Sequence, residues 1–211
     1  MRGLETFSQL VSTYNYSIPC VDIEDFPRYK FRGFMVDTSR HYLSIPVLKH
    51  LITAASWTKL NILHWHMVDD PSFPYCSTTY PELCKKGAYS PDHVYSQEDV
   101  LDVILHAYRH GVIVIPELDT PGHTLSWGHA LPGFLTHCPH HGNIGSDYGP
   151  IDPTNEDVYP VVRNLIKEVT SLFPSNFIHL GGDEVHYGCW KNNENITAWM
   201  ASHNISGNTL E

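Results

Sequence analysis

Hydrophobic positions along the chain alternate between a spacing typical of strands and a spacing typical of helices. Short apolar runs at residues 31–36, 61–68 and 112–118 have the length of buried strands. Between and after them, apolar residues recur every three to four positions, which indicates amphipathic helices. A fourth apolar run at residues 177–180 predicts another strand. The pattern therefore predicts a succession of strand–helix units.

Capping and breaking residues mark the ends of the predicted helices. Ser44 is a candidate N-cap for the first helix. Ser96, followed three residues later by Asp99, approximates a capping box, and Gly111 ends that helix. A third helix is predicted over residues 155–173.

This alternation implies parallel strands joined by right-handed crossovers, as in α/β proteins. No GxGxxG or P-loop motif follows any predicted strand, whereas polar residues gather at the carboxyl ends of all four. That pattern favours a β/α (TIM) barrel over a doubly wound sheet. Because a closed barrel needs eight units, we predict a truncated half barrel with the first four βα units. Residues 1–30 are then a lead-in segment, and residues 31–211 are the N-terminal half of the barrel domain.

Composition narrows the classes of partner. The chain has 211 residues, of which 42% are hydrophobic, and a net charge of −10 at pH 7. That charge disfavours binding to a nucleic acid. No apolar stretch approaches the ~20 residues of a membrane span, and no signal peptide is visible. Five cysteines and the sequons at Asn15, Asn195 and Asn204 nevertheless predict glycosylation and an ancestry in the secretory pathway.

Paired acids form the strongest chemical signal. Asp183 and Glu184 follow two glycines directly after the fourth predicted strand. Two neighbouring carboxyl groups can divide acid and base roles when their environments differ. The glycines would let backbone or a ligand approach closely. The alternative is a solvated acidic turn, and this pair alone does not decide between them.

A second signal is the segment DTPGH, which runs from Asp119 to His123 after the third predicted strand. His123 could orient a catalytic carboxylic acid, and Asp69 or Asp70 at the neighbouring strand end could hold that histidine. The alternative is a Pro-Gly turn with a surface histidine.

The first strand brings a third candidate group. Arg40 could bind sugar hydroxyls or a carboxylate through its planar fork, or it could simply pair with Asp37 within the same turn. What favours a shared site is that one acid falls at the end of each predicted strand, and a barrel brings those ends together. These four acids are Asp37, Asp69, Asp119 and Asp183.

The His64-Trp-His66 segment permits a competing hypothesis, a metal-dependent barrel hydrolase. No later strand supplies a matching pair of histidines. We therefore interpret these histidines as core or second-layer hydrogen-bonding residues, and we expect no metal.

Four segments carry a family resemblance: RGFMVDTSRHY (32–42), LNILHWHMVDDPSFP (60–74), PELDTPGHTLSWG (116–128) and HLGGDEVHYGCW (179–190). They closely resemble the family 20 glycoside hydrolases, in particular animal lysosomal β-N-acetylhexosaminidases. The resemblance implies release of terminal non-reducing GlcNAc or GalNAc from oligosaccharides, glycolipids or glycoproteins. The implied mechanism is retaining and assisted by the 2-acetamido group of the substrate. It further implies no cofactor, a lysosomal or secreted location, and dimerisation.

The resemblance also implies residue roles. Glu184 matches the general acid and base of the family, and Asp183 matches the residue that orients the acetamido group. Arg40 matches the ligand of the sugar hydroxyls, and Asp69 with His123 matches the relay that tunes the acid. The residues expected to support them are Asp119, Asp70 and His66.

The cysteines are assigned in the same way. Cys138 and Cys189 resemble a disulfide of the family. Cys76 and Cys84 could pair locally, which leaves Cys20. A rival to an active enzyme is a catalytically silent truncated fragment that folds only with a partner.

Overall fold

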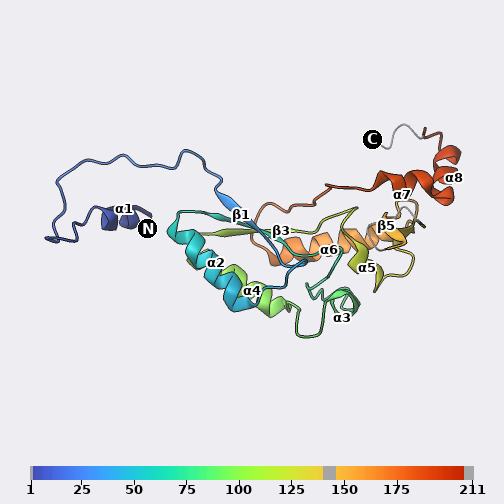
Figure 1. Ribbon diagram of the computed structural model, residues 1–211, viewed down its shortest axis with the longest axis horizontal. Helices are drawn as coiled ribbons and strands as arrows, with labels where there is room; N and C mark the ends of the chain where they lie inside the picture. Colours follow the sequence, from blue (N-terminus) through green and yellow to red (C-terminus); the bar gives the residue numbers. More distant parts are fainter. Residues whose placement is uncertain (1, 140–145, 207–211) are drawn as a thin grey trace.

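The computed structural model describes residues 2–139 and 146–206, and its centre is a sheet of three parallel strands. The strands are β1 (Gly33–Asp37), β2 (Ile62–His66) and β3 (Ile113–Glu117), in that spatial order. Helix α2 (Ile45–Trp57) connects β1 to β2, and α4 (Gln97–Arg109) connects β2 to β3. Both helices lie against the same side of the sheet (Figure 1). The predicted alternation of parallel strands and helices is confirmed.

Helix boundaries follow the predicted caps only in part. The Ser96 hydroxyl accepts the Asp99 N–H at 3.1 Å, and the Asp99 carboxylate accepts the Ser96 N–H at 2.9 Å, so the capping box of α4 is complete. Ser44 occupies the N-cap of α2 without a side-chain capping bond. The third predicted helix forms as α6 (Val158–Leu172).

The two faces of the sheet differ in chemistry. Successive strand residues point to opposite sides, so Trp65 lies beside Val36 on one face, whereas His66 lies between Asp37 and Glu117 on the other. The face that meets the helices, here the packed face, consists of Phe34, Val36, Leu63, Trp65, Val114 and Pro116. The opposite face, here the open face, consists of Gly33, Met35, Asp37, Ile62, His64, His66, Ile113, Ile115 and Glu117. The core against the packed face includes Leu48, Ile52, Leu63, Trp65, Val103, Val114 and Leu165.

The fourth predicted strand is not formed over its full length. Residues 177–180 make a single parallel bridge, between His179 and Glu117. The His179 N–H donates to the Pro116 carbonyl at 2.9 Å, and the Leu118 N–H donates to the His179 carbonyl at 3.2 Å. The segment therefore lies beside β3 in the expected order. The prediction of four complete strands is wrong, because most of this apolar run finds no second strand edge among the described residues.

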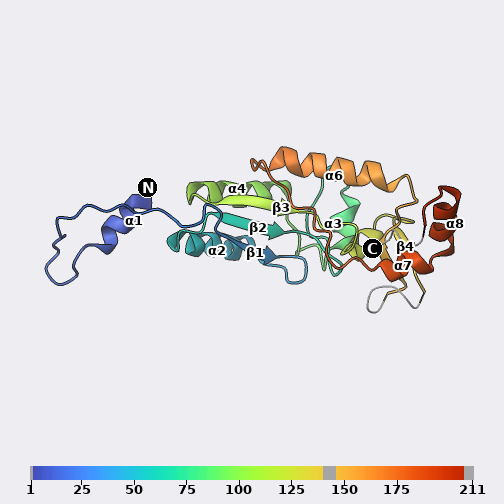
Figure 2. The same cartoon turned by 90° about the horizontal axis from the view of Figure 1, so that it is seen from above.

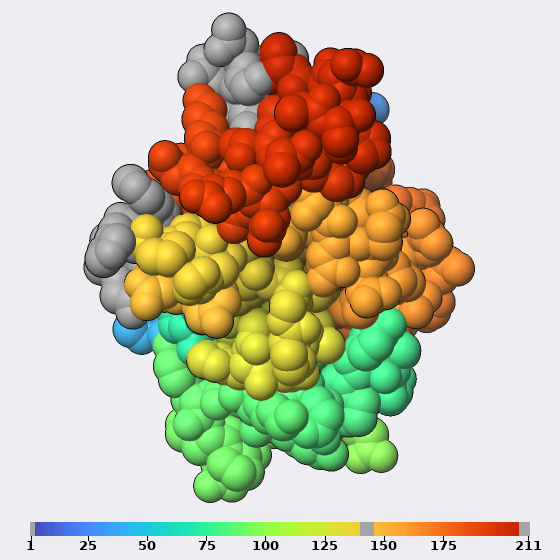
Figure 3. Space-filling view, turned by 90° about the vertical axis from the view of Figure 1, so that its right-hand side faces the viewer, coloured from blue at the N-terminus to red at the C-terminus, as the bar shows by residue number. Residues whose placement is uncertain are grey.

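Short elements collect beyond the carboxyl ends of the strands (Figure 2). Strands β4 (Leu135–His137) and β5 (Tyr148–Ile151) form an antiparallel pair inside a segment for which the sequence predicts only a loop. Figure 3 shows the surface of this end, where the yellow and orange segments lie between the green and the red ones. The helices of this end are α3 (Glu82–Gly87), α5 (Leu125–Gly128), α7 (Tyr187–Asn192) and α8 (Glu194–Ser202).

The lead-in segment lies at the opposite end of the molecule. It contains helix α1 (Arg2–Gln9) and then runs as an extended loop to β1 (Figure 1). No helix in the described part of the chain has the length and apolar character needed to cross a bilayer.

Candidate active site

The turn after β1 positions Arg40. The Asp37 carboxylate accepts the backbone N–H groups of Ser39 at 2.9 Å and of Arg40 at 3.0 Å. Its second oxygen lies 2.8 Å from Arg40 Nη1. The Arg–Asp pair expected as the structural alternative is therefore present. The same guanidinium also reaches Asp69 Oδ2 at 2.7 Å, so Arg40 belongs to the larger cluster as well.

Asp69 is the centre of that cluster. Its side chain is 1% exposed, and its carboxylate takes contacts from Arg40, from His66 Nε2 at 2.6 Å and from His123 Nδ1 at 3.2 Å. Asp70 has a different task, because its Oδ1 accepts the backbone N–H of Leu125 at 2.9 Å and thereby holds the segment after His123. Of the two predicted holders of His123, the structure places Asp69 on the imidazole.

The position of the Asp119 side chain explains why two glycines precede the acids. Its buried Oδ1 accepts the Gly182 N–H at 2.9 Å. A Cβ atom at Gly181 would lie 1.6 Å from that same oxygen, and the positive φ of 67° at Gly181 also favours glycine. Burial raises the pKa of Asp119 to about 6. The predicted close approach at Gly-Gly is therefore an approach of the Asp119 side chain.

The two candidate acids meet at His123. His123 Nε2 lies 3.5 Å from Glu184 Oε2, 3.9 Å from Asp183 Oδ2 and 4.0 Å from Asp119 Oδ2. Consecutive residues can both face His123 because Glu184 has a left-handed φ of 51° after the two positive-φ glycines. Asp183 and Glu184 are 69% and 77% exposed. Within the described residues, the buried Nε2 of His123 and Oδ2 of Asp119 have no hydrogen-bond partner. These two atoms lie 4.0 Å apart, and His123 Nε2 also faces both acids.

A buried carboxylate that the sequence did not single out lies under this cluster. Glu117, at the end of β3, contacts His64 Nε2 through Oε2. Its Oε1 lies 3.2 Å from both His66 Nδ1 and His179 Nδ1. The detectable signal was a lone acid in the apolar run VIVIPEL, opposite two histidines two positions apart.

The same residues contain a set of possible metal ligands. Ligand atoms of His64, Glu117 and His179 lie within 4.8 Å of one another. Two imidazoles and a carboxylate are a donor set that suits zinc. Here Glu117 already has His64 Nε2 as a hydrogen-bond partner, and His179 Nδ1 accepts the Gly181 N–H at 3.1 Å. These polar groups therefore have partners without an ion. The expected absence of a metal remains a prediction.

The charged forms of His66 and Glu117 are strongly stabilised by the contacts between them and their neighbours. Burial opposes a charge on His66, but hydrogen bonds to Asp69 and Glu117 outweigh it and raise the pKa of His66 to about 10. Burial likewise opposes the charge on Glu117, yet the hydrogen bonds from His64 and His66 hold the pKa of Glu117 well below its usual value. The pair is therefore an imidazolium beside a carboxylate over a wide pH range.

Two disulfides form, and one of them fixes the segment that follows the acids. Cys138 pairs with Cys189, and Cys76 pairs with Cys84, while Cys20 is free and exposed. The first disulfide joins the end of β4 to α7, only five residues beyond Glu184. Both pairings agree with the sequence-based expectations.

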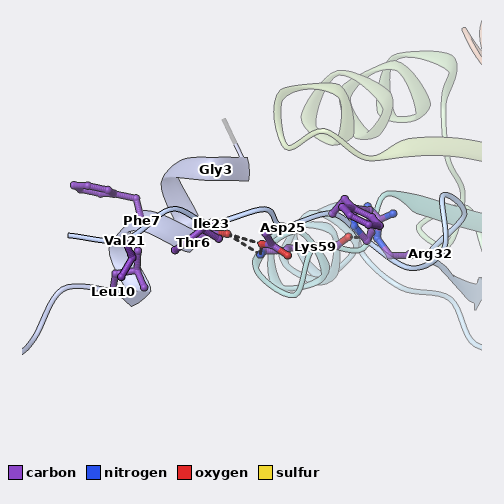
Figure 4. A pocket seen from close by; sticks show the side chains of 11 residues that line it. Gly3, Thr6, Phe7, Leu10, Val21, Ile23, Asp25, Arg32 and Lys59 are labelled. Atoms are coloured by element: carbon purple, nitrogen blue, oxygen red, sulfur yellow. Dashed lines mark hydrogen bonds and ion pairs between the residues drawn. The ribbon is translucent and has the colours of Figure 1, made fainter. Parts of the chain in front are cut away.

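The three sequons and a cavity lie outside the acid cluster. Asn15, Asn195 and Asn204 are all exposed, so their amides are accessible for the predicted glycosylation. A cavity of about 470 Å³ lies between α1 and the residues that precede β1 and β2 (Figure 4). It contains the contacts of Asp25 with Thr6 and Lys59. It lies at the amino end of the strands, away from the acids.

Comparison with known proteins decides the family. The model of the glycosyl hydrolase family 20 catalytic domain matches residues 29–210. The chain belongs to glycosyl hydrolase family 20. Over 204 residues it is 46% identical to beta-hexosaminidase subunit alpha of Rattus norvegicus, a match that covers 95% of this chain and 39% of the relative. Beta-hexosaminidase subunit beta of Homo sapiens is 48% identical over 203 residues, covering 95% of this chain and 36% of the relative.

Solved structures of family 20 proteins have a similar fold. The chitobiase of Flavobacterium johnsoniae matches with a TM-score of 0.85 and 32% identity, over 99% of this chain and 32% of that protein. An exo beta-N-acetylglucosaminidase from Vibrio harveyi, in complex with N-acetylglucosamine, matches with a TM-score of 0.83 and 28% identity, over 99% of this chain and 36% of that protein. This family 20 chain thus spans less than two fifths of the length of the curated relatives named above.

Proposed function

We propose that the chain carries the two catalytic carboxyl groups of a β-N-acetylhexosaminidase site. Such a site releases terminal GlcNAc or GalNAc from glycoconjugates. The observation that carries the proposal is the convergence of Asp183 and Glu184 on His123 Nε2, at 3.9 Å and 3.5 Å. A carboxylic acid placed beside a positioned imidazole is suited to protonating a leaving oxygen. Membership of family 20 and the names of the relatives support the substrate class.

In this proposal the two acids have different roles. Glu184 donates a proton to the glycosidic oxygen and later takes one from water. The acetamido oxygen of the substrate attacks the anomeric carbon, so the protein needs no nucleophile of its own. Asp183 holds the acetamido N–H and stabilises the positive charge that develops in the oxazolinium intermediate.

Other residues position the sugar and the acid. Arg40 offers its fork to the sugar hydroxyls, since its side chain remains 40% exposed while it holds Asp37 and Asp69. Asp69 fixes the His123 ring through Nδ1, and Asp119 holds the glycine turn from which the acids project. Asp70 and His66 support this arrangement through Leu125 and Asp69, respectively.

We further propose that the sheet is the first part of a β/α barrel. Three parallel strands, the bridged fourth segment and the site at their carboxyl ends support this, as does the family of the solved neighbours. The two disulfides and the exposed sequons support a lysosomal or secreted location.

One observation favours the alternative of a catalytically silent chain. With 77% of the Glu184 side chain and 69% of the Asp183 side chain exposed, the described residues leave both acids open to water. Exclusion of water strengthens electrostatic catalysis, so an open site is a poor catalyst.

Hydrolysis of a chromogenic N-acetylglucosaminide at about pH 4 to 5 distinguishes an active chain from a catalytically silent one. We expect turnover by the unmodified chain and its loss in Glu184→Gln, which keeps the shape of the side chain but removes the proton donor; general acids contribute about 10²- to 10⁴-fold. Glu194→Gln, at the first position of α8, is the matched control and should retain the rate. Equal rates for the unmodified chain and Glu184→Gln would establish the silent alternative.

A further inference from the structure

A continuous line of acid–imidazole contacts runs from the buried Glu117 to Glu184. Glu117 Oε1 lies 3.2 Å from His66 Nδ1, and His66 Nε2 lies 2.6 Å from Asp69 Oδ2. The other oxygen of Asp69 lies 3.2 Å from His123 Nδ1, and His123 Nε2 lies 3.5 Å from Glu184 Oε2. Each imidazole thus uses both of its nitrogens, one toward each neighbouring carboxyl group.

The register of the sheet explains why the line is continuous. His66 and Glu117 are paired residues at the last positions of β2 and β3, so their side chains lie side by side on the open face. His66 is 6% exposed, Glu117 is 5% exposed and Asp69 is 1% exposed. Water therefore has little access to replace any of these contacts, and removal of one charge leaves its neighbours without a buried counter-charge.

Glu117 places a negative charge directly beside His66, which shares Asp69 with a second cation. Arg40 Nη1 and His66 Nε2 both lie on Asp69 Oδ2, only 3.3 Å from each other. Two cations at that distance repel. They share Asp69, and Asp37 contacts Arg40 at 2.8 Å. The second negative charge next to His66 is Glu117, and Asp37 contributes a more distant one.

We propose that Glu117 is a positioning residue: its carboxylate keeps His66 an imidazolium, which holds Asp69 so that Asp69 Oδ1 accepts the Nδ1–H of His123. His123 is then fixed in the tautomer that leaves Nε2 available to the proton of Glu184. This inference rests on the proposed function only for what Glu184 does with that proton.

Charged groups face the members of the line from several elements. Besides Asp69, His123 is faced by Arg40 Nη2 at 3.3 Å from Nδ1, and by Asp119, Asp183 and Glu184 around Nε2. His66 is faced by Asp37 at the end of β1, by Arg40 from the turn after β1, by Asp69 from the segment after β2, and by Glu117 from β3. Glu117 is also faced by two further imidazoles and by the Asp119 carboxyl group. Those imidazoles belong to His64 and His179.

Nitrogen NMR of the histidine rings in the full chain tests this assignment without any need for activity. At about pH 8, where an ordinary imidazole is neutral, we expect both His66 nitrogens to carry protons and His123 to carry its proton on Nδ1. In Glu117→Gln, His66 should lose a proton by that pH, with a titration midpoint lower by roughly two units. His123 should then lose its strict preference for Nδ1–H.

A neutral His66 at that pH in the unmodified chain would overturn the proposal. So would a His123 tautomer that is unchanged in Glu117→Gln. Glu168→Gln is the control, since Glu168 is another partly buried carboxylate that accepts four side-chain hydroxyls, and it should leave both rings unchanged. If Glu117→Gln does not fold, the unmodified chain decides: the His123 tautomer must change at the pH where His66 deprotonates.

Kinetics add a second measurement. In an active chain, Glu117→Gln should lower kcat roughly tenfold, a fraction of what a general acid contributes, with KM changed by less than about twofold. A fall in kcat/KM carried by KM alone would contradict a positioning role. Absence of turnover in the unmodified chain would count against the proposed function, whereas the ring nitrogens would still decide the role of Glu117.

Discussion

The packed face and the open face of the same three strands differ in what their residues do. On the packed face, Trp65 is fully buried, packs edge-on against Tyr95 and donates its indole N–H to Thr38 at 2.9 Å. One residue further along β2, His66 lies on the open face in a line of charged contacts. Because the side-chain period of a strand is two, a single strand supplies both the hydrophobic core and the site. The packed face carries the hydrophobic core, and the open face carries the charged residues that lie under the proposed site.

Truncating one side chain on each face should show how much each face contributes to stability. Among the predictions, this one has the largest expected effect on the free energy of unfolding. Trp65→Ala removes a large buried ring and should lower the free energy of unfolding by about 3–5 kcal/mol. Ile113→Ala on the open face, where Ile113 is 52% exposed, should cost less than about 1 kcal/mol. Urea denaturation of both variants measures the difference. Equal losses would mean that the open face is as well packed as the other.

A methyl group at the glycine turn should act on the site at the carboxyl ends of the strands and leave the packed face unchanged. Gly181→Ala brings a Cβ atom into the Asp119 carboxylate and strains a residue with φ of 67°. We expect a loss of about 1–3 kcal/mol in unfolding free energy, together with displacement of the acids. Gly188→Ala in α7 meets no atom within 4 Å and is the control. Thermal unfolding followed by circular dichroism compares them, and similar behaviour of the two variants would contradict the turn geometry.

The pH dependence of stability should reflect His66 and Glu117 on the open face and Asp119 just beyond it, with a smaller effect than the substitutions above. Burial raises the pKa of Asp119 from 3.8 to about 6, so the unfolding free energy should fall as pH rises through that interval. The pKa of His66 is raised from 6.5 to about 10, so its stabilisation is complete below 6.5 and is lost toward pH 10. The pKa of Glu117 is lowered, so its stabilisation is lost as pH falls below 4.5. Stability should therefore be greatest at about pH 4 to 5.

Urea titrations at a series of pH values measure this profile. Asp119→Asn should flatten the decline between about pH 4 and 6 and leave the decline toward pH 10, which belongs to His66. A maximum at pH 8 in the unmodified chain would contradict the assigned directions of these pKa shifts.

Periodicity predicted the parallel units because each strand and helix buries one face against the next. The sequence also predicted the meeting of Asp69, Asp119 and His123, since parallel strands end at the same edge of a sheet. The fourth strand was overpredicted, because an apolar run at 177–180 is not enough when only one neighbouring edge is present among the described residues. The β4–β5 pair was missed because its strands are too short to show a period.

Glu117 shows why part of the site was not predicted. Its neighbours in sequence are apolar, and the contacts that define it come from His64 and His66 on one side and from His179 on the other. Those contacts depend on strand register, which the chain's periodicity does not specify. The acid pair, by contrast, was visible because two glycines and two acids stand together in the sequence.

Affinity for an oxazoline-like inhibitor tests the central claim most directly, because it needs the two acids and His123 to share one site but does not need turnover. Calorimetry on the unmodified chain, Asp183→Asn and the control Asp92→Asn is the measurement. We predict that Asp183→Asn weakens binding about 10- to 100-fold, the loss of one charge-assisted hydrogen bond, while Asp92→Asn binds as tightly as the unmodified chain. Equal affinity for all three would contradict the assignment of Asp183 and with it the proposed site.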